Sequence, residues 1–233
     1  LIRDALHPYP AHLVIATKAG LERSGPDQWR TDCRPDRLQA HCEASLRRLG
    51  LDRIPLFQLH RVDPAVPFAD QLGALVELRE QGKIEHIGLS EVGVEQIEAA
   101  RAITPIVSVQ NMYNLVNRGH DPVLAHCERE GIVFIPWVPL GSGSLVGVDG
   151  PLSAVASSLR VSPSQLALAW LLQRSPVMAP IPGTRSVAHL EQNVRAAEVR
   201  LIDSDVEAIE DATAGRALGK GLRKVKGMLR RSR

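Results

Sequence analysis

Short apolar runs alternate with segments of helical periodicity along most of this chain. Six of the runs are typical of buried strands, and each one is followed by a segment with the spacing of an amphipathic helix. The expected strands lie at residues 13–17, 54–59, 84–89, 106–109, 132–135 and 177–181. Strict alternation of strand and helix predicts a parallel sheet with right-handed crossovers. We therefore expect an α/β protein.

Two α/β architectures fit this pattern, an open doubly wound sheet and a closed barrel. No expected strand is followed at once by GxGxxG, the usual phosphate turn of the open fold. Nearly every strand instead ends in a different polar residue, which suits a ring whose loops all face one site. We predict a (β/α)8 TIM barrel with about six of the eight βα units in this chain. Residues 1–6 have the pattern of a helix already under way, so we expect the other two units to precede Leu1.

The expected helices follow from apolar spacing and from flanking Pro and Gly residues. They lie at about 35–49, 68–81, 94–103, 122–130, 152–159, 163–173, 187–197 and 203–212. We predict a polar loop at residues 25–32. The sequence has no Asn-Gly pair between alternating apolar and polar runs, which is the pattern that would indicate a hairpin.

The composition is that of a globular protein, with 44% apolar and 23% charged residues. No apolar run approaches the ~18 residues of a membrane span, and the opening residues lack a signal-peptide pattern. The three cysteines, Cys33, Cys42 and Cys127, have no metal-ligand spacing. An odd number without a framework favours reduced thiols and a cytoplasmic location.

The charge is unevenly distributed along the chain. From Arg216 onward there are eight basic residues and no acidic one. We therefore expect a barrel-like domain at 1–213 and a basic tail at 214–233. Apolar residues in the tail share one helical face, which would suit an anionic membrane surface or nucleic acid, although three glycines weaken that helix. A solvated tail is the simpler interpretation, and we expect no nucleic-acid partner.

Polar side chains stand at the carboxyl ends of the expected strands, which converge on one face of a barrel. A lysine at a buried strand end, Lys18, is costly unless it is paired or functional. Together with His60 it suits general acid–base work or Schiff-base chemistry. The Ser90 hydroxyl and the Gln110 amide could hold a flat polar ring on which Trp137 stacks. Each of these residues, taken alone, is more often structural.

Two further segments have features of phosphate sites. The loop at 140–144 offers Gly-based backbone N–H groups. Thr184 and Arg185 precede the expected helix at Val187, where an anion would meet a helix N-terminus and a cation.

Several motifs together resemble those of the aldo-keto reductases, the NADP-dependent barrel oxidoreductases. The resemblance spans about residues 1–212, in order and at family-like spacing. It is carried by Val14-Ile15-Ala16-Thr17-Lys18, Leu59-His60, Gly82-Lys83-Ile84-Glu85-His86-Ile87-Gly88-Leu89-Ser90, Val109-Gln110-Asn111-Met112-Tyr113-Asn114, Trp137-Val138-Pro139-Leu140-Gly141, Pro180-Ile181-Pro182-Gly183-Thr184 and Glu191-Gln192-Asn193.

The resemblance implies hydride transfer between NADP(H) and a small carbonyl substrate. In that family a Tyr donates the proton, a Lys lowers the pKa of the Tyr, an Asp pairs with the Lys, and a His orients the carbonyl. Lys18 and His60 match the Lys and the His. Ser90 and Gln110 match the carboxamide clamp, and Trp137 the aromatic side chain that stacks on the nicotinamide. The other implied cofactor-binding residues are Glu91, Pro139, Leu140, Gly141, Ser142, Gly183, Thr184, Arg185, Gln192 and Asn193.

The chain departs from the family pattern at several positions. Glu91 stands where many members have Asn, and Gly183 and His189 replace a Lys and an Arg that grip the 2′-phosphate. The preference for NADP over NAD therefore rests largely on Arg185. The family's Asp and Tyr lie before the opening helix, and Tyr9 is expected near the opposite end of the barrel.

Three functional interpretations follow. The first is a cytoplasmic NADP-dependent reductase of small aldehydes or ketones. The second is a protein that binds the cofactor without turning it over, and the third is an aldolase that uses Lys18 as a Schiff-base residue. The sequence does not indicate an oligomeric state.

Overall fold

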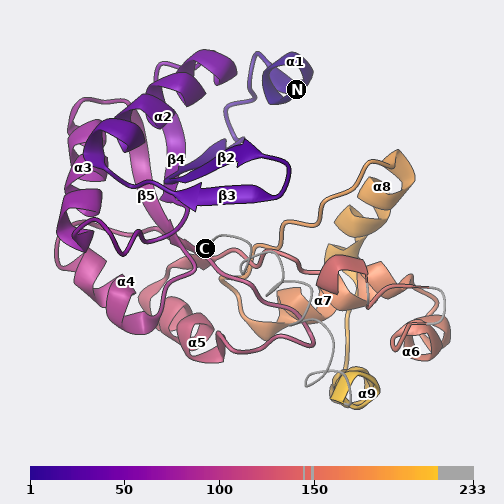
Figure 1. Cartoon of the computed structure of the whole chain (residues 1–233). Coiled ribbons are helices and arrows are strands. Elements are labelled where there is room, and N and C mark those ends of the chain that lie inside the picture. Colours follow the sequence, from indigo (N-terminus) through magenta and orange to yellow (C-terminus); the bar gives the residue numbers. More distant parts are fainter. Residues whose placement is uncertain (144, 148–149, 215–233) are drawn as a thin grey trace. The chain divides into compact units, whose positions relative to one another are not determined.

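A computed structural model describes residues 1–143, 145–147 and 150–214, and its chain forms two compact units (Figure 1). The first unit spans Leu1–Val109 and the second begins at Gln110. Within the described residues no helix has the length and apolar character needed to cross a bilayer. The predicted tail at 214–233 lies, apart from its first residue, outside the described residues, so the expected division at 213 stays a prediction.

The first unit is built on parallel strands. They are β1 (Ala16–Ala19), β4 (Ile54–Leu59) and β5 (Ile84–Ser90), in that order across the sheet. β6 (Ser108–Gln110) comes next to β5 in the sheet, and its last residue is the first of the second unit. Lys18 lies opposite Gln58, and Leu59 lies opposite Leu89. β1 begins and ends later than the sequence predicts, so Lys18 lies within the strand instead of just beyond it. The predicted parallel α/β arrangement is confirmed.

Three helices cover this sheet, and the residues at their ends explain where they begin and stop. α2 (Pro35–Leu49) has Pro at its first position and ends at Gly50, whose φ of 66° favours glycine. α2 packs on α3 (Phe68–Glu80) and on β1, and α3 packs on β5. α4 (Val94–Arg101) follows β5, and a short α1 (Ile2–Leu6) precedes the sheet. The core between them is aliphatic, with Phe57 fully buried.

A hairpin follows β1 where the sequence predicts a polar loop, so that prediction is wrong. β2 (Leu21–Gly25) and β3 (Gln28–Thr31) pair antiparallel around a turn in which Asp27 has a φ of 57°. Their side chains are exposed or half-buried, so the sequence shows no alternation of apolar and polar residues. The turn also lacks Asn-Gly, the strongest hairpin signal.

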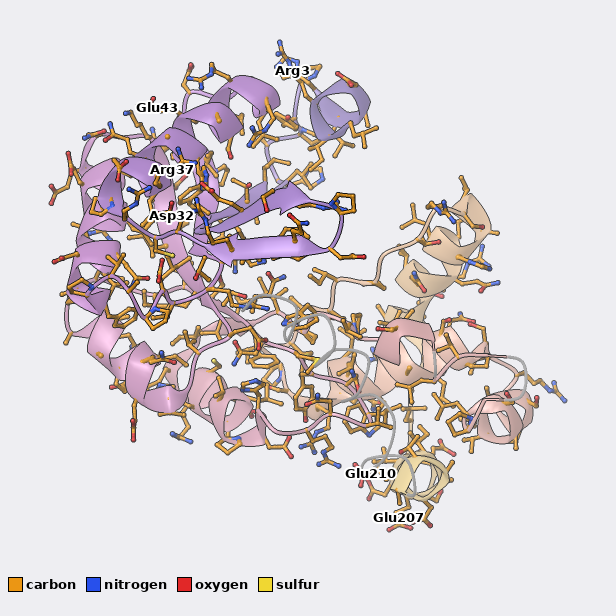
Figure 2. All side chains as sticks on the ribbon, viewed as in Figure 1. Arg3, Asp32, Arg37, Glu43, Glu207 and Glu210 are labelled. Carbon is orange, nitrogen blue, oxygen red and sulfur yellow. The ribbon has the colours of Figure 1, made fainter. Side chains whose placement is uncertain are left out.

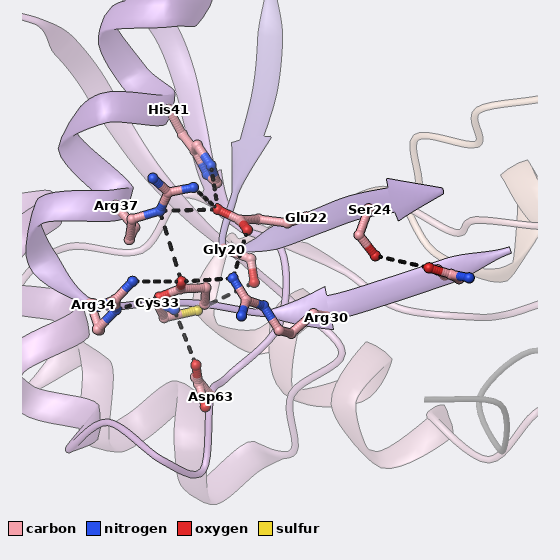
Figure 3. Close-up of polar contacts among 11 residues, drawn as sticks. Gly20, Glu22, Ser24, Arg30, Cys33, Arg34, Arg37, His41 and Asp63 are labelled. Atoms are coloured by element: carbon pink, nitrogen blue, oxygen red, sulfur yellow. Dashed lines mark hydrogen bonds and ion pairs between the residues drawn. The ribbon is translucent and has the colours of Figure 1, made fainter. Parts of the chain in front are cut away.

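Charged side chains fasten the base of this hairpin to α2 (Figures 2 and 3). Arg34 donates two hydrogen bonds of 2.9 Å to Asp32, and Arg37 donates to Glu22. Arg30 reaches both carboxylates, at 3.1 Å from Glu22 and 3.5 Å from Asp32. The hydrogen bond from Arg34 is the main reason why the pKa of Asp32 is lowered, and the one from Arg37 is the main reason for Glu22. This network fixes the polypeptide that leaves the Lys18 strand.

The second unit is mainly helical in its described residues. Its elements are α5 (Asp121–Glu130), β7 (Val133–Phe134), the 3₁₀ turn η1 (Gly141–Gly143), α6 (Ser153–Ser158), α7 (Pro163–Arg174), α8 (Val187–Arg195), the 3₁₀ turn η2 (Ala196–Glu198) and α9 (Asp203–Ala214). The strand expected at 177–181 is reduced to a single bridge between Met178 and Phe134. Pro180 lies inside that run and has no N–H group for a sheet, which accounts for the difference.

An aromatic and charged cluster forms part of the core of the second unit. Trp170 of α7 is buried and stacks on Tyr113, with 6.3 Å between ring centroids. The Arg118 and Arg174 guanidinium groups each lie 5.5 Å from the Trp170 ring, within range of a cation–π interaction. Arg118 also donates a 3.0 Å hydrogen bond to Glu210 of α9, which is labelled in Figure 2. The cluster therefore anchors α9 to the rest of the unit.

Candidate active site

The carboxyl ends of β1, β4 and β5 lie at one edge of the first unit's sheet, because parallel strands point the same way. They carry Lys18, His60 and Ser90, which the sequence predicts as site residues. The His60 N–H donates a 2.8 Å hydrogen bond to the Ala19 carbonyl, so His60 continues the pairing of β4 with β1. Ser90 is the last residue of β5 and is 2% exposed. The structure thus brings these three residues together.

The electrostatics of this edge favour a neutral imidazole. Burial lowers the pKa of His60 to about 4, and the charges of Lys18 and Arg61 add to the shift. The pKa of Lys18 is lowered as well, first by burial and then by Arg61. At neutral pH His60 is uncharged and has one ring N–H to donate. A neutral donor of this kind can hold a carbonyl oxygen without competing for the proton of a neighbouring acid.

Arg61 is a site residue that the sequence reasoning missed. Its Nη1 donates hydrogen bonds to the His60 carbonyl at 2.8 Å and to the Ser90 Oγ at 3.2 Å. Burial lowers the pKa of this guanidinium, which the charge of Glu91 partly offsets. The signal was present in the sequence, since Arg61 stands two residues after the buried run 54–59, and a charged side chain that is buried there is costly unless it is paired.

Glu91 has an unusual backbone conformation. Its φ is 57°, in the left-handed region that non-glycine residues seldom adopt. Such strain occurs most often at binding sites and active sites. Its predicted contact with the cofactor stays a prediction, and its charge acts on Arg61.

The remaining predicted residues belong to the second unit. Gln110 ends β6 and is 4% exposed, and the Trp137 side chain is half-buried. The Trp137 N–H donates to the Asn111 carbonyl at 3.1 Å, and the Tyr113 N–H donates to the Trp137 carbonyl at 3.4 Å. Trp137 is therefore held beside the segment that follows Gln110. Pro139, two residues further on, is buried.

The predicted pyrophosphate loop is a tight turn. Gly141 donates to the Val138 carbonyl and Gly143 to the Leu140 carbonyl, each at 3.1 Å. Ser142 between them has a φ of 55° and is exposed. Ser144 lies outside the described residues. The loop's phosphate contact stays a prediction.

The predicted 2′-phosphate region leads into α8. The Ser186 side chain accepts from the His189 N–H at 3.4 Å and caps the helix, and Thr184 accepts from the Ser186 N–H at 3.1 Å. Gly183, Thr184 and Arg185 are exposed. Gln192 and Asn193 lie half-buried within α8. A helix N-terminus preceded by an exposed arginine suits an anionic group.

The hydroxyl groups of the two tyrosines in the chain are each hydrogen-bonded to another group. The Tyr9 hydroxyl donates to the Leu49 carbonyl at 2.8 Å. Leu49 ends the helix that precedes β4, so Tyr9 lies toward the amino ends of the strands, as expected. Tyr113 is buried in the second unit, and its hydroxyl donates to Asp121 at 2.5 Å.

In the part of the chain that the structure describes, no group of three or more His, Cys, Asp or Glu side chains is placed to hold a metal ion. Cys33, Cys42 and Cys127 are all buried and free of disulfides.

Comparison with known proteins identifies the family. The model of the Aldo/keto reductase family matches residues 1–214. An uncharacterised oxidoreductase of Schizosaccharomyces pombe is 52% identical over 201 residues, which cover 86% of this chain and 65% of the yeast protein. Pyridoxine 4-dehydrogenase of Escherichia coli is 40% identical over 216 residues, which cover 90% of this chain and 75% of the bacterial protein. The chain therefore spans about two thirds to three quarters of the length of these relatives.

Solved structures support the same assignment of fold. The glycerol dehydrogenase of Gluconobacter oxydans superposes with a TM-score of 0.81 at 25% identity, covering 92% of this chain and 76% of that protein. A thermostable aldo-keto reductase, solved with the inhibitor epalrestat, gives a TM-score of 0.71 at 29% identity, with coverages of 77% and 67%. The predicted barrel fold class and the predicted family resemblance are both confirmed.

Proposed function

The chain belongs to the aldo/keto reductase family, and on that premise we propose that it serves hydride transfer between NADP(H) and a small aldehyde or ketone. The observation that carries this proposal is the edge formed by Lys18, His60 and Ser90, with a neutral imidazole at its centre. The three buried free cysteines also support a reducing compartment, and we place the protein in the cytoplasm.

The side chains of the first unit have defined tasks in this reaction. The cofactor supplies a hydride to the carbonyl carbon, and the carbonyl oxygen takes a proton to become an alcohol. The His60 ring N–H holds the carbonyl oxygen and orients it. The Lys18 charge lowers the pKa of the proton donor, which in this family is a tyrosine. Neither Tyr9 nor Tyr113 fits that role, since each hydroxyl is engaged elsewhere.

The residues present fit a nicotinamide cofactor. Ser90 and Gln110 are buried polar side chains at strand ends, where they would hold the carboxamide. Trp137 would stack on the ring. Backbone and hydroxyl groups of Leu140, Gly141 and Ser142 would hold the pyrophosphate. Thr184, Arg185, Gln192 and Asn193 would hold the adenosine and its 2′-phosphate.

A second function is also worth testing, because the hydroxyl groups of Tyr9 and Tyr113 are both hydrogen-bonded to other groups. In that case this chain binds NADP(H) but does not turn it over. Without a tyrosine hydroxyl to donate the proton, the reduction would not proceed, whereas cofactor binding by the proposed residues would be unaffected.

Two assays separate these functions. NADPH binding is followed by quenching of tryptophan fluorescence, and turnover by loss of NADPH absorbance with a panel of small aldehydes and ketones. We expect this chain to bind NADPH, and we expect turnover once the chain is extended at Leu1 by the family segment that carries Asp and Tyr. Absence of both binding and turnover would contradict both functions. Borohydride trapping of a substrate on Lys18 would instead support the aldolase alternative.

Substitutions at the proposed catalytic residues test their roles. We expect Lys18→Met and His60→Gln to lower kcat/KM of the extended chain by about 100-fold or more, the usual range for groups that assist proton transfer. Lys83→Met is the matched control, because Lys83 precedes β5 at the amino end of the strands and pairs with Glu43. The control should keep its activity.

Cofactor preference is tested at α8. Arg185→Met should weaken NADPH binding by about 10-fold or more, the value of one charge-assisted contact, and leave NADH binding unchanged. Arg195→Met removes an exposed arginine from the other end of α8 and serves as the control. Equal weakening of NADPH and NADH would show that Arg185 does not read the 2′-phosphate.

A further inference from the structure

We propose that Arg61 is a positioning residue of this site: its guanidinium ties the end of β4 to the end of β5 and places a positive charge beside His60 and Lys18. The inference rests on the proposed function and adds a residue to it. Arg61 is not assigned a role by the family motifs that identify Lys18, His60 and Ser90.

The geometry shows how Arg61 joins the two strands. Its Nη1 lies 2.8 Å from the His60 carbonyl oxygen and 3.2 Å from the Ser90 Oγ. His60 follows the last residue of β4, and Ser90 is the last residue of β5. A single guanidinium nitrogen therefore fixes the backbone of the proposed carbonyl-orienting residue and the side chain of the proposed carboxamide-binding residue.

This contact also sets the direction of the Ser90 hydroxyl. Because the Ser90 Oγ accepts a hydrogen bond from Arg61, its own hydrogen points to a different acceptor. Ser90 is thus presented as a donor, which suits the carbonyl oxygen of a carboxamide. Without Arg61 the hydroxyl is free to rotate, and part of this preorganisation is lost.

The charges around His60 come from three strand ends. Lys18 lies on β1, Arg61 follows β4, and Glu91 follows β5 and acts on Arg61. Asp63 is also near in sequence, but its carboxylate accepts hydrogen bonds from the backbone N–H groups of Cys33 and Ala65. The two cations disfavour a third positive charge on the imidazole, so Arg61 acts in the same direction as burial.

The backbone of Glu91 fits the same arrangement. Its left-handed φ of 57° is costly for a glutamate, and the residue follows Ser90 directly. Its carboxylate offsets part of the cost of burying the Arg61 charge. A glutamate in place of the asparagine common in the family is therefore explained as the counter-charge of Arg61.

The first readout is the protonation of His60, measured by NMR on the chain itself with labelled histidine and assigned with His60→Gln. In Arg61→Met we expect the pKa of His60 to rise by about one unit, the effect of losing a nearby charge in a partly buried site. Arg61→Lys keeps the charge and should keep the low value. Arg47→Met, which removes an exposed arginine from α2, is the control and should leave the value unchanged.

The second readout is NADPH affinity. Arg61→Lys and Arg61→Met should each weaken binding by about 10-fold, because the shorter lysine side chain ends before the position of the arginine Nη1 and methionine has no donor for the two oxygens. If Arg61→Met does not fold, Arg61→Lys alone tests the proposal. An unchanged pKa of His60 together with weaker NADPH binding would support it. The proposal is overturned if both variants bind NADPH as the parent does, or if the pKa of His60 does not move in a folded Arg61→Met. A parent chain that fails to bind NADPH contradicts the proposed function, whereas the NMR result still decides the role of Arg61.

Discussion

Asp32 and Arg34 lie two residues apart and are joined by two hydrogen bonds of 2.9 Å, although Asp32 is buried and Arg34 is exposed. Arg34 is also the N-cap residue of α2, directly before Pro35. The pair therefore fixes the point where the hairpin β2–β3 passes into α2 (Figure 3). A carboxylate at this depth is stable only because several cations surround it.

Removing this charge should destabilise the first unit. We expect Asp32→Asn to lower the free energy of unfolding by about 1–3 kcal/mol, because it removes the charge that pairs with Arg34 and places a buried amide NH2 group against the guanidinium donors. Urea denaturation followed by circular dichroism measures the change. Asp27→Asn is the control, since Asn tolerates the left-handed conformation of that exposed turn residue. Equal stability of Asp32→Asn and the parent would show that the network is not needed.

The neutral state of His60 predicts a dependence of stability on pH. The pKa of His60 is about 4 in the folded chain and about 6.5 in an unfolded one. Between these values the unfolded state binds the proton and the folded state does not, so the free energy of unfolding rises as the pH increases from about 4 to about 6.5.

The measurement is urea denaturation at several pH values across this window. In His60→Asn the free energy of unfolding should rise less steeply between pH 4 and 6.5. Above pH 7 its dependence on pH should be the same as in the parent. His12→Asn changes an exposed histidine and should keep the slope of the parent. A parent whose stability does not depend on pH in this range would show that His60 titrates normally.

Substitution by alanine is predicted to change the free energy of unfolding in opposite directions at two glycines, Gly88 and Gly73. A Cβ at Gly88 in β5 would lie against the Ser108 Oγ, 3.0 Å from the Gln58 Cγ and 3.1 Å from the Ser108 carbonyl oxygen. Gly88→Ala should lower the free energy of unfolding by about 1–3 kcal/mol, as overpacking usually does.

Gly73 is inside α3 with open space around it. Gly73→Ala should raise the free energy of unfolding by about 0.5–1 kcal/mol through helix propensity. Thermal unfolding distinguishes these shifts, and an equal effect of both changes would be inconsistent with the packing around Gly88.

The sequence was sufficient for the parts of the fold that rest on burial. The strand that ends at Leu59 and the helices that stop at Gly50 and Gly131 are placed within a residue or two, because apolar periodicity and αL glycines mark them locally. The hairpin at Leu21–Thr31 was missed because its strands bury little surface. Its order comes from ion pairs between residues that no local pattern links, such as Glu22 with Arg37.

The candidate site likewise has residues that local sequence patterns indicate and one whose role depends on contacts between strands. Strand ends identify Lys18, His60 and Ser90, because a polar side chain that closes an apolar run is visible in the sequence. The role of Arg61 depends on which oxygen atoms its guanidinium reaches across two strands. That geometry appears only when β4 and β5 are paired in register.

The last prediction concerns an exposed apolar face on α8. Val187, Leu190 and Val194 are 74%, 52% and 67% exposed and recur at the spacing of one helical face. Because these side chains bury little surface, we expect Leu190→Lys combined with Val194→Lys to change the free energy of unfolding by no more than about 0.5 kcal/mol. Urea denaturation measures the change. Ile202→Lys, at another residue that is 67% exposed, is the control and should have an equally small effect. A loss of several kcal/mol in the double variant would show instead that this face is covered in the folded protein.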